Sequence, residues 1–178
     1  MANKYKRRTL RALNAQTQAY PIDMTLDSGF DRTQGALSGA NAITGAKAAI
    51  LPGMVAALKA TQIVTVCGAQ GASPGIRPVG LFAQFVGGEM SDIPSDFDKV
   101  GVWRGAGSTF EVLAPAFDDT NLATDAAAQD GSAAKEVYLI SGTKGQLGDA
   151  TAGAYAVNRT ARLIDRLSAN AIIVELLV

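Results

Sequence analysis

The residues whose type and spacing could support chemistry are three aspartates that lie close together, Asp92, Asp96 and Asp98. Carboxylates at this spacing could hold a hard cation such as Ca²⁺ together with loop carbonyls. A calcium-binding EF-hand loop counted from Asp92 would need a glycine at its sixth position and an acid at its twelfth, where this chain has Phe97 and Trp103. We therefore interpret this segment as a solvated acidic turn and assign no metal ligand.

Two further motifs lack residues that a catalytic or phosphate-binding site would need. Asp118 and Asp119 form an acid pair, but adjacent side chains usually diverge and no partner base or nucleophile can be named. The glycine-rich stretch 68–75 could make a phosphate-binding loop after a strand, yet neither GxGxxG nor GxxxxGK[ST] occurs in the chain. We interpret these glycines as turn residues.

The composition argues against catalysis more generally. The chain has no histidine, the commonest general base and transition-metal ligand. The single Cys67 excludes an internal disulfide and a thiolate cluster, and is typical of synthesis in a reducing compartment. We expect no catalytic, cofactor-binding or metal-binding residues, and hence a protein that is not an enzyme.

The charge distribution is strongly asymmetric. The first acidic residue is Asp23, whereas five basic residues precede it: Lys4, Lys6, Arg7, Arg8 and Arg11. The chain has 16 basic and 16 acidic residues, so the remainder has 11 against 16 and a net charge of −5. A cationic arm on an anionic body favours a negatively charged protein partner, because the acidic body would oppose nucleic acid.

The 178 residues fit one domain with an arm. Residues 1–45 mix basic, polar and glycine positions without a sustained apolar period, which predicts an extended N-terminal arm. The alternation of Ile22, Met24 and Leu26 with polar residues predicts one strand, which lies against the body or against another subunit. For residues 4–14, a short helix is an alternative to a solvated tail. No apolar run approaches the roughly 20 residues that span a bilayer, and no secretory signal follows the basic start.

The pattern of residues 46–178 predicts a body of short strands bounded by turn residues. The expected runs are a hairpin of 54–58 and 62–67, then 79–85, 100–104, 109–113, 136–140, and a closing hairpin of 161–167 and 172–178. The last run is apolar on both faces, which predicts a central strand or an oligomer interface. The fold class is therefore mainly β, a compact β-sandwich or barrel-like body with an extended N-terminal arm.

Two expectations complete the body. Residues 114–134 lack an apolar period and predict a long loop, with a short helix over 122–129 as the alternative. The aromatic residues in or beside strand-like runs have no interleaved basic residues and are interpreted as core anchors rather than a base-stacking platform: Phe82, Phe85, Trp103 and Phe110.

Several short motifs, taken in order, carry a family resemblance. They are Ile50-Leu51-Pro52-Gly53-Met54-Val55, Pro78-Val79-Gly80-Leu81-Phe82-Ala83, Gly87-Gly88-Glu89-Met90 and Val100-Gly101-Val102-Trp103-Arg104-Gly105. This succession resembles tailed-phage head decoration, or cement, proteins, and the hairpin from Ala161 to Val178 is similar to phage structural proteins. The resemblance covers residues 50–113 and 136–178.

The resemblance implies a non-enzymatic virion structural protein, made in the host cytoplasm, that stabilises a bacteriophage capsid from its outer surface. The partner would be the major capsid protein, and the decoration protein would be a homo-oligomer, with a trimer favoured. The arm would clamp neighbouring capsid subunits through charged and apolar contacts. The expected partner-binding residues are Lys4, Tyr5, Lys6, Arg7, Arg8, Leu10, Arg11, Leu13 and Tyr20. The alternatives are a tail or head-connector subunit, or a nucleic-acid-binding module that uses the basic arm.

Overall fold

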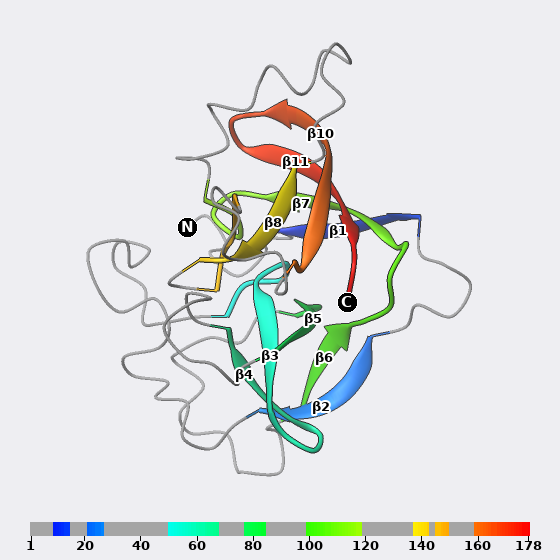
Figure 1. Cartoon of the computed structure of the whole chain (residues 1–178), viewed down its shortest axis with the longest axis vertical. Coiled ribbons are helices and arrows are strands. Elements are labelled where there is room, and N and C mark those ends of the chain that lie inside the picture. Colours follow the sequence, from blue (N-terminus) through cyan, green and yellow to red (C-terminus); the bar gives the residue numbers. More distant parts are fainter. Residues whose placement is uncertain are drawn as a thin grey trace, which may run out of the picture.

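The structure is a computed structural model, and it describes the residues that form the two sheets and their close connections. These are residues 9–14, 21–26, 50–67, 77–84, 99–118, 137–142, 145–149 and 159–178. They form eleven β-strands, arranged as an open sheet and a closed barrel that lie one above the other in Figure 1.

The open sheet has six strands in the order β1-β7-β11-β10-β8-β9, and every pair is antiparallel. The strands are β1 (Leu10–Asn14), β7 (Thr109–Leu113), β8 (Tyr138–Ser141), β9 (Leu147–Asp149), β10 (Ala161–Ser168) and β11 (Ala171–Leu176). Strands from both ends of the described chain therefore meet in one sheet, since β1 and β11 both pair with β7.

The barrel is closed by β2, which pairs in parallel with β4 and antiparallel with β6. Its strands are β2 (Ile22–Leu26), β3 (Val55–Ala60), β4 (Ile63–Val66), β5 (Arg77–Phe82) and β6 (Lys99–Trp103). Closure leaves no free edge in this sheet, so the open sheet supplies the edges of the described fold.

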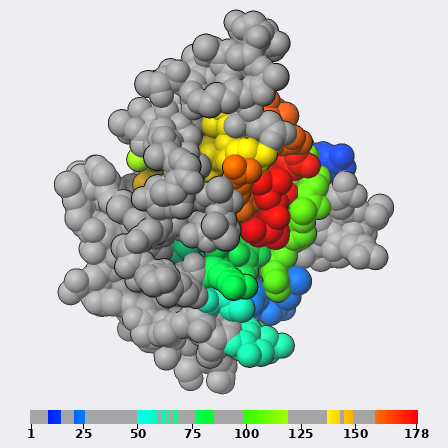
Figure 2. Space-filling view, viewed as in Figure 1, coloured from blue at the N-terminus to red at the C-terminus, as the bar shows by residue number. Residues whose placement is uncertain are grey.

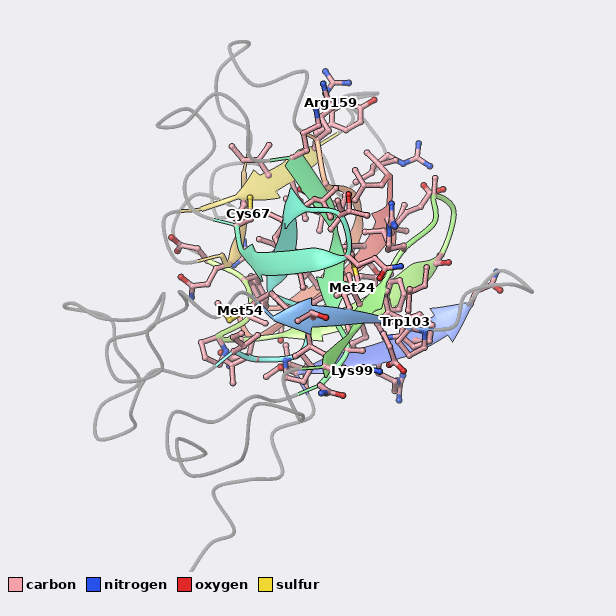
Figure 3. The ribbon with its side chains drawn as sticks, turned by 90° about the horizontal axis from the view of Figure 1, so that it is seen from below. Met24, Met54, Cys67, Lys99, Trp103 and Arg159 are labelled. Atoms are coloured by element: carbon pink, nitrogen blue, oxygen red, sulfur yellow. The ribbon has the colours of Figure 1, made fainter. Side chains whose placement is uncertain are left out.

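One hydrophobic core joins the two sheets. Met54 and Phe82 from the barrel side and Phe110 and Leu139 from the open sheet are fully buried in the same cluster. Met24 of β2 is also buried, and Figure 3 labels it together with Met54. Two sheets around one core confirm the mainly β, sandwich or barrel-like fold predicted from the sequence.

Both predicted hairpins are confirmed. β3 pairs with β4, and β10 pairs with β11, each in antiparallel register. β11 lies between β7 and β10, with Ile172, Val174 and Leu176 buried on one face. Of the two alternatives for this apolar strand, the structure therefore shows a central strand.

Phe82 and Phe110 are core anchors, and Trp103 packs edge-on against Phe110 with ring centres 5.3 Å apart.

The structure corrects the helix alternative near the start of the chain. Residues 10–14 form a strand because the backbone pairs with β7, which outweighs the weak helical pattern of Leu10 and Leu13. The alternating residues Ile22–Leu26 are a strand, as predicted, and lie against the body within the barrel. β9 was not predicted.

Several predictions fall on residues outside the described ranges. These are residues 1–8 and 15–20 of the arm, the arm boundary at residue 45, the glycine-rich stretch 68–75, Phe85, the acidic turn 92–98, Asp119 and the helix alternative over 122–129. At the start of the predicted loop 114–134, Ala116 and Phe117 are buried and so belong to the core.

Two buried hydroxyl groups, Ser108 Oγ and Thr160 Oγ1, have no hydrogen-bond partner in the described part of the chain. Replacing Ser108 with alanine or Thr160 with valine should leave the free energy of unfolding unchanged or raise it by about 1 kcal/mol, since an unsatisfied polar group is removed. Ser141→Ala is the matched control: its Oγ donates to the Cys67 carbonyl at 2.7 Å, so its loss should cost about 1 kcal/mol. Urea unfolding measures all three, and a clear loss in Thr160→Val would contradict the expectation.

Candidate functional site

Three of the nine predicted partner-binding residues lie in the described part of the chain, and all three are on β1. They are Leu10, Arg11 and Leu13. The other six, Lys4, Tyr5, Lys6, Arg7, Arg8 and Tyr20, lie outside it. β1 is the first strand of the open sheet, and Figure 2 shows it at the rim of the molecule beside β7 and β11.

Thr9 anchors β1 to the body. The residue is buried, and its Oγ1 donates a hydrogen bond of 2.5 Å to the carbonyl of Pro52. Its own carbonyl accepts a hydrogen bond of 2.8 Å from the backbone N–H of Leu113. Pro52 belongs to the turn before β3, so one residue ties the start of β1 to both sheets. The basic cluster before Thr9 is thus covalently joined to a fixed point at the sheet edge.

The three predicted residues have different surroundings. Leu10 is half-buried and packs against the core. Arg11 is 70% exposed, and its Nε lies 2.9 Å from Oε2 of Glu111 on β7, directly opposite in the register. Leu13 is 41% exposed at a register shift between Ala12 and Asn14. Leu10 and Arg11 therefore hold the strand to the body, whereas Leu13 presents apolar surface to solvent.

The Arg11–Glu111 pair should contribute modestly to stability. A double-mutant cycle with Arg11→Ala, Glu111→Ala and both together should give a coupling energy of about 0.5 kcal/mol, because the Arg11 side chain is 70% exposed and water competes for it, although Glu111 is only 20% exposed. The coupling should shrink in 1 M salt, which screens exposed charges. Urea unfolding at low and high salt measures it, and a coupling that does not change with salt would argue against a screened surface pair.

Two further side-chain contacts involve charged and aromatic residues on or beside strands of the open sheet. Arg162 on β10 donates from Nε to Oε2 of Glu175 on β11 at 3.0 Å. The guanidinium carbon of Arg159, labelled in Figure 3, lies 3.6 Å from the ring centre of Tyr138. The Arg162–Glu175 contact pairs opposite charges, and both contacts orient long side chains.

The sequence did not predict that two apolar residues on β10 are exposed. Ile164 and Leu167 are 50% and 52% exposed. Each is the extra residue at a register shift between β10 and β11, and such bulges redirect side chains. The adjacent apolar pair Leu163-Ile164 could have indicated this exposure, because successive side chains of a strand point to opposite faces of the sheet.

The described part of the molecule offers surfaces for binding. Among the described residues, no group of three or more histidine, cysteine, aspartate or glutamate side chains could hold a metal ion. Within the same residues, no helix is long and apolar enough to cross a membrane. What the described surface presents is a strand edge, paired charges and a few apolar side chains.

Comparison with known proteins agrees with an all-β structural protein that acts by binding. The family model described as phage cement protein matches residues 1–177, which is almost the whole chain. The chain therefore belongs to the phage cement protein family, the capsid decoration proteins, and is a non-enzymatic component of the virion capsid. Searches of curated proteins and of solved structures gave no significant match.

Proposed function

We propose that this cement protein binds the outer surface of a phage capsid and that its N-terminal arm clamps the major capsid protein of neighbouring subunits. The observation that carries the proposal is the attachment of the basic cluster at the sheet edge: Lys4, Lys6, Arg7 and Arg8 directly precede the anchored Thr9. A fixed attachment point limits the volume that a charged segment must search, which lowers the entropic cost of binding.

The roles within the arm follow from charge and burial. The four basic residues before Thr9 supply complementarity to an acidic capsid surface. Tyr5, Leu13 and Tyr20 supply apolar contact. Leu10 and Arg11, which contact the body, hold the root of the arm in place. The proposal includes a homo-oligomer, with a trimer favoured, as the family resemblance implies. Many copies acting together would make weak individual contacts sufficient.

The test is co-sedimentation with expanded, undecorated capsids at near-physiological salt. Three proteins are compared: the full chain, a chain lacking residues 2–8, and a chain in which Lys4, Lys6, Arg7 and Arg8 are all glutamine. The full chain should bind saturably, and both variants should lose affinity by about tenfold or more. A variant with arginine at positions 4 and 6 is the matched control and should bind normally.

Each outcome separates one part of the proposal from another. Equal affinity of all variants would remove the arm as the clamp while keeping capsid decoration. Failure of the full chain to bind any capsid would remove the proposed function. Sedimentation equilibrium of the free protein tests the trimer, and a monomer at all concentrations would contradict it.

A further inference from the structure

The two edges of the open sheet differ in how their backbones are covered. At one edge, β9 is three residues long, and the segment after β7 lies against it. The N–H of Leu147 donates to the carbonyl of Ala116 at 3.1 Å, and the N–H of Asp118 donates to the carbonyl of Leu147 at 2.8 Å. This edge is blunted, as exposed edges of native sheets usually are.

At the other edge, β1 directs backbone groups away from the sheet. Leu113 donates to the carbonyl of Thr9, so these two residues form a hydrogen-bonded pair of the ladder. Antiparallel pairs alternate, which makes Arg11 and Glu111 the next hydrogen-bonded pair and turns the N–H and C=O groups of Leu10 and Ala12 outward. No strand formed by the described residues pairs with β1 on that side.

The edge also has the features of a template for another strand. Residues 11–14 are exposed, and β1 contains no proline that would remove a donor. Its bulge comes after Ala12, so the stretch from Leu10 to Ala12 keeps regular geometry. Main-chain hydrogen bonds along such an edge provide affinity in proteins that bind extended peptides by strand addition.

We propose that an extended, acidic segment of the major capsid protein adds to β1 as a further strand of the open sheet. This inference rests on the proposed function, because the occupant is the partner that a cement protein binds. In the sequence, this edge directly follows four basic residues, Lys4, Lys6, Arg7 and Arg8, and β1 itself adds Arg11, so the partner is expected to have the opposite charge. An acidic segment satisfies both features.

The β1 strand of a second copy is the poorer occupant. The first acidic residue of the sequence is Asp23, so neither β1 nor the residues before it offer an opposite charge to a neighbouring β1. Pairing of two β1 strands would also use up the edge that leads from the body to the arm. Charge complementarity therefore favours the capsid segment.

The first test is a proline substitution that removes one outward donor. Ala12→Pro removes the backbone N–H of residue 12, which points away from β7 and makes no hydrogen bond to it. Proline is tolerated at such edge positions. The affinity for undecorated capsids should fall by about tenfold, with unchanged stability in urea. Ala12→Ser keeps the N–H and should bind as the original chain does. Equal binding of Ala12→Pro and Ala12→Ser would overturn the inference.

A second test uses the unaltered protein and does not depend on the folding of a variant. Amide hydrogen exchange of a peptide covering residues 9–14 is measured in the free and the capsid-bound protein. Leu10 and Ala12 should exchange fast when free and at least about tenfold more slowly when bound. A peptide covering β9 is the internal control and should not change. Binding without protection of β1 overturns this inference alone, whereas no binding by the full chain overturns it together with the proposed function.

Discussion

Replacing Gly80 with alanine should prevent the barrel from closing in its native form. A Cβ atom at this position would lie 1.9 Å from the carbonyl oxygen of Trp103 and 2.9 Å from its carbonyl carbon. These are backbone atoms of the neighbouring strand β6, so they cannot move aside as the end of a flexible side chain could. The expected loss in the free energy of unfolding is about 3 kcal/mol or more, at the upper end of measured overpacking costs.

Gly148→Ala is the matched control for this experiment. Gly148 also lies in a strand, β9, but a Cβ atom there would meet no atom within 4 Å. Its effect should stay within about 0.5 kcal/mol. Trp103 is the single tryptophan of the chain and lies beside Gly80, so its fluorescence during urea unfolding reports on the site directly. Similar midpoints for Gly80→Ala and the original chain would show that β5 and β6 can separate at little cost.

Removing residues 2–20 should destabilise the body, whereas removing residues 2–8 should not. The longer deletion takes away β1, the Thr9 hydrogen bonds to Pro52 and Leu113, and the contact of Leu10 with the core. At about 1 kcal/mol for each hydrogen bond and a similar amount for a half-buried leucine, the loss should be about 3 kcal/mol. The shorter deletion leaves Thr9, β1 and their contacts in place, so we expect it to cost less than about 0.5 kcal/mol.

Urea unfolding and capsid co-sedimentation of both truncated chains test this prediction together. The shorter chain should be as stable as the full chain and still bind poorly. If both deletions were equally stable, β1 would contribute nothing to the sheet. A loss of capsid binding in the longer chain cannot by itself be assigned to the basic arm, because that chain also lacks a strand.

The strands that could be predicted from the sequence are those whose side chains alternate around the core. Ile172, Val174 and Leu176 are fully buried on one face of β11, and the same alternation is visible in the sequence. β1 has no such pattern, because four of its five residues are exposed and it is held by backbone pairing with a distant strand. β9 has three residues with a central glycine, too few to establish a period.

The candidate site was predictable in its charge but not in its geometry. The concentration of basic residues before Thr9 is a property of the sequence alone. The pairing of Arg11 with Glu111 depends on register between strands almost 100 residues apart, which no local pattern specifies. The outward direction of the Leu10 and Ala12 backbone groups follows from the same register. Likewise, the exposure of Ile164 and Leu167 results from bulges set by the pairing of β10 with β11.

The strand order of the open sheet also links β1 to a strand near the other end of the described chain. β1 leaves the ribosome first, but its partner β7 is itself held by β11, the last strand of the sheet in sequence. Pairings between such distant segments form slowly, because loop closure must precede them. A chain translated only as far as β7 would therefore lack β11, which pairs with the side of β7 opposite β1.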